Sequence, residues 1–434
     1  MFKKKVFPLV GLLALGALVG CAGAAKQEEE KNKIYIWATA AEKAVIDKIV
    51  GDYNKTAEEK IAYEVVQISE ADAGTSLLKD PRVKNAPALV LLADDQINDL
   101  VTQNDLAEVV GTYKTNTQTM NTAVAVEGAT NSEKLYGFPI TNDNGYFLYY
   151  DNTQLTATDV TSLETILQKA RVAGKSVLMD VSNGWYANSF IMSPQACGTT
   201  SLQWHKDDAG KIYYDCNWDN DKGVEISTYI GGLLKPYYDD KTLVTGGNAD
   251  ISRGFEEQKL IAAVSGTWME QGGDAADGAK GLSTILGDKL AAAKLPSYHI
   301  GDDAYQMTSF TGSKVYVVNQ TRPAEEKIKA MLLGDLLANS KESQLIRYEL
   351  RNTIPCNKEA MADARFTEHQ TKAVAALSAQ TAIASCVQSK TAESRYWNIG
   401  QAIGQAYLDG DFGTDGDNWG EFLYVKAEAL RKHA

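Results

Sequence analysis

Two adjacent aromatic residues, Trp185 and Tyr186, stand among amide side chains directly after a stretch with strand preference. Consecutive aromatic side chains at a strand end are poor material for a core, because one of them must face outward. Polar side chains likewise follow two other predicted strands, namely Glu42, Lys43, Asp94, Asp95 and Gln96. Aromatic rings can cover the apolar face of a sugar ring, and carboxylates accept strong hydrogen bonds from its hydroxyl groups. These residue types therefore favour a site for a polyhydroxylated ring.

Strands that alternate with helices would position these residues. Strand-like runs cover residues 33–38, 62–68 and 88–92. Between the first two runs, one face of a predicted helix carries Val45, Ile46, Ile49, Val50 and Tyr53. This order of elements predicts βαβ units and a mainly parallel sheet. Ligands of such sheets bind beyond the carboxyl ends of the strands, where the charged and amide residues named above lie.

Residues 134–153 join two strand-like runs through a polar, glycine-containing step. The first run contains Gly137 and Pro139, which oppose a helix, and the second is an aromatic run with high strand preference. Asn144-Gly145 between two such runs is typical of a β-hairpin turn. The polar step equally suits a hinge that lines a wet cleft, so residue spacing alone leaves both alternatives open.

The residue order of this stretch resembles the first crossover between lobes in the maltose/maltodextrin-binding protein family, a group of bacterial sugar-binding lipoproteins. The shared pattern is Tyr-Gly-Phe-Pro at residues 136–139, then mostly polar residues, then an aromatic pair followed by Asp-Asn at residues 151–152. Partial matches lie in the family's order on either side of this stretch, at residues 89–109 before it and at residues 261–269, 336–358 and 395–398 after it. The resemblance implies an α/β, periplasmic-binding-protein-like fold, in which hinge crossovers join two α/β lobes with the ligand cleft between them.

The resemblance also implies roles for individual residues. It assigns Asp95 to a ligand of sugar hydroxyls, Asp143 to an acidic cleft residue, and Tyr186, Trp268 and Trp397 to aromatic contacts with sugar. The predicted ligand-binding set is completed by residues from strand ends or their neighbourhood: Glu42, Lys43, Gln96 and Trp185. The chain departs from the family pattern at Leu92, Gln96 and Gln401. These departures leave the identity of the sugar open.

Three of these assignments have a structural alternative. Asp95 also suits the N-cap of the helix that follows it. Asp143 could form hydrogen bonds within its own turn. Trp268 could be a core residue, although the glycines around it favour open space.

The first residues of the chain resemble a bacterial lipoprotein signal. Three lysines at positions 3–5 precede a short apolar run, and Leu-Val-Gly-Cys ends at Cys21. We therefore expect a signal peptide over residues 1–20, a lipid on Cys21, and a tether over residues 21–33. An uncleaved anchor or a buried helix is the alternative. The expected location is the extracytoplasmic face of the cell membrane.

The two lobes are expected to be discontinuous in sequence. The predicted N-terminal lobe comprises residues 34–141 and about 312–365, and the predicted C-terminal lobe residues 142–311 and about 366–434.

The formal net charge of −13, without basic clusters, argues against nucleic acid as a partner. The resemblance implies a monomeric, cofactor-free carrier and not an enzyme: the substrate-binding lipoprotein of an ABC importer, which captures maltodextrins or related oligosaccharides and delivers them to a membrane permease. The alternatives are a carrier for another oligosaccharide, a surface adhesin, and a glycoside hydrolase that uses Asp95 and Asp143. No metal is predicted, because glycine in the acidic turn at residues 219–223 does not sit where an EF-hand requires it.

Four cysteines remain besides Cys21, and an even number in an exported chain favours disulfides. We expect Cys197 to pair with Cys216, and Cys356 with Cys386. Free buried thiols are the alternative.

Overall fold

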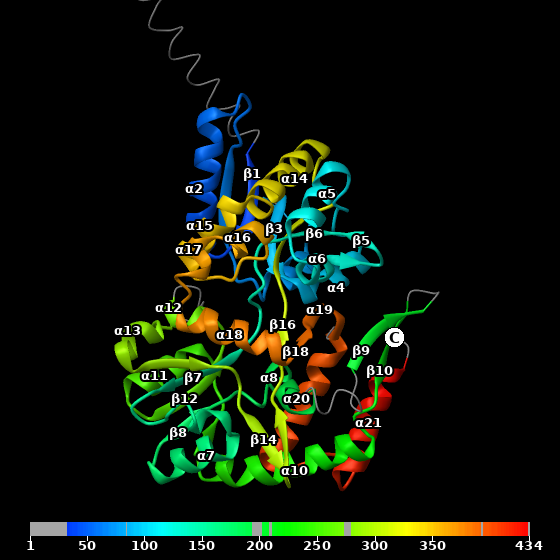
Figure 1. Ribbon diagram of the computed structural model, residues 1–434. Helices are drawn as coiled ribbons and strands as arrows, with labels where there is room; N and C mark the ends of the chain where they lie inside the picture. Colours follow the sequence, from blue (N-terminus) through cyan, green and yellow to red (C-terminus); the bar gives the residue numbers. More distant parts are fainter. Residues whose placement is uncertain are drawn as a thin grey trace, which may run out of the picture.

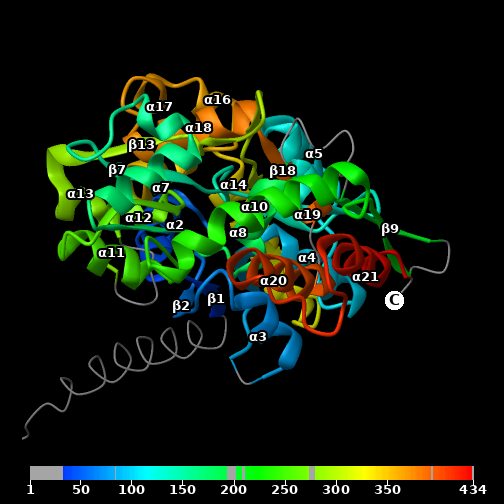
Figure 2. The same cartoon turned by 90° about the horizontal axis from the view of Figure 1, so that it is seen from below.

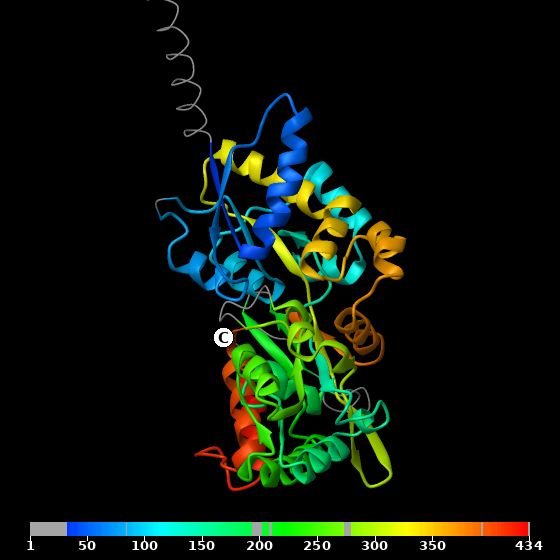
Figure 3. The same ribbon diagram turned by 90° about the vertical axis from the view of Figure 1, so that its left-hand side faces the viewer.

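The structure is a computed structural model that describes residues 33–83, 85–192, 202–207, 211–272, 279–391 and 394–432. The predicted signal peptide, Cys21 and Cys197 lie outside the described residues. Two lobes lie one above the other, joined by extended segments (Figures 1 and 3). None of the helices within the described ranges is both long and apolar enough to cross a membrane.

The first lobe is built on a five-stranded sheet with the order β2-β1-β3-β17-β6. The strands are β1 (Ile34–Ala38), β2 (Tyr63–Gln67), β3 (Leu89–Ala93), β17 (Lys314–Val318) and β6 (Gly137–Pro139). β1 pairs in parallel with β2 and β3, whereas β17 runs antiparallel to β3 and β6. A short pair, β4 (Thr130–Asn131) and β5 (Lys134–Leu135), lies beside it.

Helices cover this first sheet. They are α2 (Ala40–Thr56), α3 (Ala73–Lys79), η1 (Asp94–Gln96), α4 (Ile97–Thr102), α5 (Gly111–Met120), α6 (Ala123–Gly128), α14 (Ala324–Ala338), α15 (Lys341–Arg351), α16 (Lys358–Met361) and α17 (Ala364–Thr367). The predicted apolar face of α2 is confirmed, since Val45, Ile46, Ile49 and Val50 are all buried.

The second lobe is built on another five-stranded sheet, with the order β11-β8-β12-β7-β13. The strands are β7 (Phe147–Asp151), β8 (Ser176–Leu178), β11 (Leu243–Val244), β12 (Leu260–Ser265) and β13 (Leu290–Ala293). Side chains of β7 alternate between two buried clusters, with Phe147 and Tyr149 in one and Leu148 and Tyr150 in the other. Because successive side chains of a strand point to opposite faces, this aromatic run is buried on both sides of its sheet.

The remaining elements surround the second sheet. The helices are η2 (Asp159–Thr161), α7 (Leu163–Val172), α8 (Gly184–Ile191), α10 (Asp221–Asp239), α11 (Asn248–Glu256), α12 (Trp268–Gln271), α13 (Leu282–Leu286), η3 (Gly287–Lys289), α18 (Lys372–Ile383), α19 (Gln388–Thr391), α20 (Ser394–Asp409) and α21 (Trp419–Arg431). Paired strands are β9 (Leu202–Lys206) with β10 (Ile212–Cys216), β14 (Ser297–Ile300) with β15 (Asp303–Gln306), and β16 (Ser309–Thr311) with β18 (Ser385–Val387). Seen from below, α10, α20 and α21 lie together on this lobe (Figure 2).

Residues 134–153, for which a β-hairpin was one alternative, form a crossover between the two sheets. β6 belongs to the first sheet and β7 to the second, so the strands on either side of Asn144-Gly145 do not pair. The chain returns where β16 leads into β17, which inserts between β3 and β6. The periplasmic-binding-protein-like fold is thus confirmed, while the lobe boundaries given above stay predictions.

Candidate ligand-binding cavity

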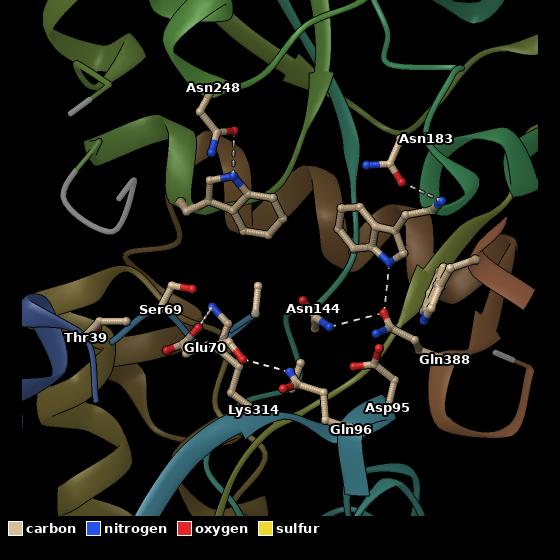
Figure 4. Close-up of a pocket in the computed structure, with 15 residues that line it drawn as sticks. Thr39, Ser69, Glu70, Asp95, Gln96, Asn144, Asn183, Asn248, Lys314 and Gln388 are labelled. Carbon is tan, nitrogen blue, oxygen red and sulfur yellow. Dashed lines mark hydrogen bonds and ion pairs between the residues drawn. The ribbon is translucent and has the colours of Figure 1, made fainter. Parts of the chain in front are cut away.

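A cavity of about 500 Å³ lies between the lobes (Figure 4). The first lobe lines it with residues at or just beyond the carboxyl ends of β1, β2 and β3, together with Lys314 of β17: Thr39, Ser69, Glu70, Ala71, Ala93, Asp95, Gln96 and Lys314. Lys314 joins this set because β17 runs antiparallel to β3 and pairs Lys314 with Ala93. The second lobe and the crossover contribute Asn144, Asn183, Trp185, Asn248, Trp268, Gln388 and Trp397.

Three half-buried tryptophans supply the aromatic part of the wall: Trp185, Trp268 and Trp397. The ring centroids of Trp185 and Trp268 are 5.9 Å apart, with 29° between the ring planes. Trp268 folds back over the end of β12 because Gly266 has no side chain; a Cβ there would lie 2.1 Å from the indole ring. Its Nε1 donates a hydrogen bond to Asn248 Oδ1 at 3.2 Å, which fixes the ring orientation.

Ion-paired side chains form the polar wall of the first lobe. Lys314 Nζ lies 3.2 Å from Glu70 Oε2, and Arg351 Nη2 donates to Glu70 Oε1 at 3.0 Å. Burial opposes ionisation of Glu70, but Lys314 and Arg351 outweigh it and hold the pKa of this carboxyl below its usual value. Gln96 fixes the same loop, since Nε2 donates to the Glu70 carbonyl at 2.8 Å and Oε1 accepts from the Gly74 N–H at 2.7 Å.

Asp94 and Asp95 follow β3 side by side in η1. Burial raises the pKa of Asp94 to about 8, and the neighbouring Asp95 carboxylate adds to this effect. Burial also raises the pKa of Asp95 to about 6, although a hydrogen bond with Gln388 opposes the shift. Asp94 Oδ2 accepts from the Ser313 N–H at 3.0 Å, while Oδ1 is buried without a hydrogen-bond partner. Asp95 lines the cavity, whereas Asp94 is buried behind it.

We expect Asp94→Asn to flatten the pH dependence of stability. A carboxyl whose folded-state pKa is raised stabilises the fold fully below its unfolded pKa, and this contribution is lost as pH rises through the folded pKa. The contribution of Asp94 to the free energy of unfolding should therefore fall by about 5 kcal/mol between roughly pH 4 and pH 9, and the variant should lose much of that slope. Urea unfolding across this range measures the effect. Asp288→Asn, on the exposed turn η3, is the control, and equal slopes in all three proteins would contradict the prediction.

Comparison with known proteins gives the family. The model of the family described as "Bacterial extracellular solute-binding protein" matches residues 48–376, well over half of the chain. The chain belongs to this family. No match was found among curated proteins.

Solved structures of several sugar-binding proteins share the fold. The ligand-free maltodextrin-binding protein MalE1 of L. casei BL23 has a TM-score of 0.73 at 20% identity, covering 92% of this chain and 99% of its own. The GacH receptor of Streptomyces glaucescens has a TM-score of 0.71 at 16% identity, with coverages of 93% and 99%. The maltose-maltodextrin-binding protein of Alicyclobacillus acidocaldarius has a TM-score of 0.68 at 14% identity, with coverages of 92% and 100%. At these identities the likeness establishes the fold alone.

The cavity of this solute-binding protein brings together part of the predicted ligand-binding set. Its lining contains Asp95, Gln96, Trp185, Trp268 and Trp397. Glu42, Lys43, Asp143 and Tyr186 are not among the lining residues.

Glu42 forms a buried ion cluster in place of the predicted cavity edge. It is 0% exposed, and its carboxylate accepts hydrogen bonds from Arg347 (Nη2 to Oε1, 2.8 Å), Arg351 and the Tyr316 hydroxyl (2.8 Å). Lys43, the next residue, pairs with Asp47 on the exposed side of α2. Both residues lie near the predicted edge of the sheet, but neither is among the residues that line the cavity, and their role in ligand binding stays a prediction.

The other two residues lie behind the cavity wall. Asp143 Oδ2 accepts a hydrogen bond from the Ile354 N–H at 3.3 Å, and the Asp143 side chain is buried. Tyr186 packs its ring against Tyr146, with 5.0 Å between the centroids, while the neighbouring Trp185 reaches the cavity. Both aromatic residues lie in the first turn of α8, which explains why adjacent side chains point in different directions.

Several lining residues were missed by the sequence reasoning. Ser69 and Glu70 directly follow the predicted strand at residues 62–68, so the strand-end rule would have found them if applied to that strand. Asn144 lies in the crossover, and Lys314 begins the strand of the return crossing. Gln388 had no signal in its neighbouring sequence.

The predicted disulfide between Cys356 and Cys386 is wrong. Cys356 is a free, buried thiol whose Sγ donates toward the Pro139 carbonyl at 3.3 Å, in the first lobe. Cys386 lies on β18 beside β16. Cys216 is also a free, buried thiol, and its predicted partner Cys197 lies outside the described residues. In the part of the chain that the structure describes, no group of three or more His, Cys, Asp or Glu side chains is arranged to hold a metal ion.

Proposed function

We propose that this protein is the oligosaccharide-binding component of an ABC importer, with maltodextrins as its expected ligands. The observation that carries the proposal is the composition of the cavity wall. Trp185, Trp268 and Trp397 offer flat apolar surfaces, while Asp95 and Glu70 offer carboxylates at the opposite wall. This combination suits a sugar ring, which has apolar faces and a hydroxylated edge.

The sugars bound by structural relatives support this choice of ligand. Similar solved structures include a maltodextrin-binding protein and proteins that hold acarbose, maltotetraose or maltose. These compounds are all built from sugar or sugar-like rings, and the cavity described above offers the matching aromatic and carboxylate surfaces.

The expected mechanism is closure of the two lobes around the ligand. A sugar that touches Trp268 of the second lobe and Asp95 of the first makes its full set of contacts only when the cleft is shut. It therefore stabilises the closed form through its differential affinity for the two states. The closed form then docks on a membrane permease, and a lipid on Cys21 keeps the protein at the extracytoplasmic face of the membrane.

The two carboxylates considered for glycoside hydrolysis do not both line the cavity. Hydrolysis of a glycoside needs a pair of carboxyl groups on either side of the scissile bond, one of them protonated. Asp143, which was considered for this pair, does not line the cavity. Glu70 and Asp95 do: Lys314 and Arg351 hold the pKa of Glu70 below its usual value, whereas burial raises the pKa of Asp95 to about 6, so the assay for hydrolysis products decides between the two roles.

Calorimetric titration of residues 22–434 with maltose, maltotriose, longer maltodextrins and several β-linked oligosaccharides tests the proposal. Each mixture is analysed for hydrolysis products afterwards. Saturable binding of maltodextrins without product is the expected result. Binding of β-linked sugars alone would contradict maltodextrins as the ligands but would leave the carrier role standing. Cleavage of any sugar would overturn the carrier role.

A further inference from the structure

Helix α19 is a single turn that lies between the two lobes. It follows β18, which pairs with β16 of the return crossing, and it contacts η1 of the first lobe. From the other side, Trp204 of β9 donates its indole N–H to the Ser389 carbonyl at 2.8 Å. The first residue of α19, Gln388, is 3% exposed and lines the cavity. The backbone around Gln388 is therefore held in place by both neighbours.

The side chain of Gln388 is hydrogen bonded to residues of two other segments (Figure 4). Its Oε1 accepts hydrogen bonds from Trp185 Nε1 at 2.8 Å and from Asn144 Nδ2 at 3.2 Å. An indole N–H can only donate, so the oxygen of the amide must face Trp185. The NH₂ group is then left as the free donor of this side chain beside η1, against which α19 packs and whose Asp95 lines the same cavity. One amide group thus joins α8 to the first crossover and lies beside η1.

We propose that Gln388 is a positioning residue of the cavity: its amide ties the Trp185 ring of the second lobe to the Asp95 carboxylate of the first. The tie fixes the spacing between an aromatic surface and a carboxylate edge. In the closed cleft, a sugar that stacks on the ring and donates a hydroxyl hydrogen to the carboxylate then has both groups held in register. This inference rests on the proposed function only for the nature of the ligand.

Two substitutions distinguish the acceptor role of the Gln388 amide from its donor role. Gln388→Ala removes the acceptor for Trp185 and the donor for Asp95 together. Gln388→Glu keeps an acceptor for Trp185 and Asn144, but places a second carboxylate against Asp95, where two ionised groups repel. If the tie exists, the two variants must therefore differ in their effect on Trp185.

The first test is an NMR measurement without ligand. The indole N–H resonance of Trp185, assigned by its loss in Trp185→Phe, reports the hydrogen bond to Gln388. Gln388→Ala should shift this resonance upfield, toward the position of an indole without a protein acceptor, whereas Gln388→Glu should leave it downfield. A resonance that stays in place in Gln388→Ala, in a variant with wild-type circular dichroism, would overturn the tie.

The second test is the affinity for maltotriose, or for the maltodextrin that wild type binds most tightly. Loss of preorganised hydrogen bonds should weaken binding about tenfold in Gln388→Ala, and about 30-fold in Gln388→Glu, where charge repulsion is added. Combining Gln388→Glu with Asp95→Asn restores a donor opposite an acceptor. The double variant should therefore bind more tightly than Gln388→Glu alone, which is the coupling expected of groups in direct contact.

Gln405→Glu is the matched control. Gln405 on α20 is exposed, and its amide donates to Asp409 Oδ2 at 2.8 Å, so the substitution makes the same charge change beside a surface carboxylate. It should bind like wild type. Additive effects of Gln388→Glu and Asp95→Asn would overturn the positioning role. Failure of wild type to bind any sugar would instead count against the proposed function, and the NMR result would still decide whether the tie exists.

Discussion

Glu42→Ala is expected to lower the free energy of unfolding by about 3–5 kcal/mol, the usual cost of removing one partner from a buried ion cluster. Arg347 and Arg351 both lose their buried carboxylate, and neither side chain is exposed to water. Tyr316 loses the acceptor of its hydroxyl group at the same time. The cluster joins the start of α2, helix α15 and strand β17, so the loss affects three elements of the first lobe.

The pH dependence of this contribution has a definite sign. Burial opposes ionisation of Glu42, but Arg347 and Arg351 outweigh it and lower the pKa to about 2. The stabilisation is therefore complete above the ordinary pKa of 4.5 and is lost as pH falls toward 2. Wild type and Glu42→Ala should differ most in neutral buffer and least in acid.

Chemical denaturation at neutral pH measures the difference. Glu42→Gln, which keeps a hydrogen-bond acceptor but not the charge, should fall between wild type and Glu42→Ala. Asp52→Ala is the control on the same helix, because Asp52 pairs with Lys48 and Lys55 on the exposed face of α2 and should leave the midpoint near wild type. A Glu42→Ala midpoint equal to that of the control would contradict the prediction.

Glu42 also shows a limit of the rule that ligands bind beyond the carboxyl ends of parallel strands. The rule correctly predicted the edge of the sheet, but it says nothing of the direction in which a side chain points. Glu42 falls on the same helical face as Val45, Ile46 and Ile49, at spacings of three, four and seven residues. Helical periodicity thus contained the signal that this carboxylate faces the core, where only buried arginines could satisfy it.

The crossover illustrates the same limit for strand pairing. Asn144-Gly145 satisfies the local signal for a hairpin, yet β6 pairs with β17, whose residues follow far later in the chain. Gln388 is the extreme case, because its partners Asn144 and Trp185 precede it by 244 and 203 residues. Periodicity and turn chemistry therefore predicted the elements of this fold, whereas contacts between distant segments decided the topology and part of the site.

Trp268→Ala is expected to weaken maltodextrin binding by about 2–3 kcal/mol, or roughly 30- to 150-fold, the effect typical of an aromatic anchor in a binding site. The Trp268 ring is set in place before ligand arrives, since Asn248 accepts from its Nε1 and Gly266 leaves room for it over the end of β12. Lys314 Nζ also lies 5.8 Å from the ring centroid, at the junction with the polar wall. Removal of the ring deletes an apolar surface from the cavity wall and leaves Asn248 Oδ1 without its hydrogen bond from the indole.

Calorimetry with the best maltodextrin ligand measures this loss, and thermal unfolding without ligand shows whether the fold is retained. Trp268→Phe should bind with intermediate affinity, because it keeps a smaller ring but loses the hydrogen bond to Asn248. Tyr424→Ala is the control: this aromatic side chain is 54% exposed on α21 and does not line the cavity. If Trp268→Ala binds as tightly as the control, the ring does not contact the ligand, and Trp185 and Trp397 alone would have to supply the aromatic surface of the site.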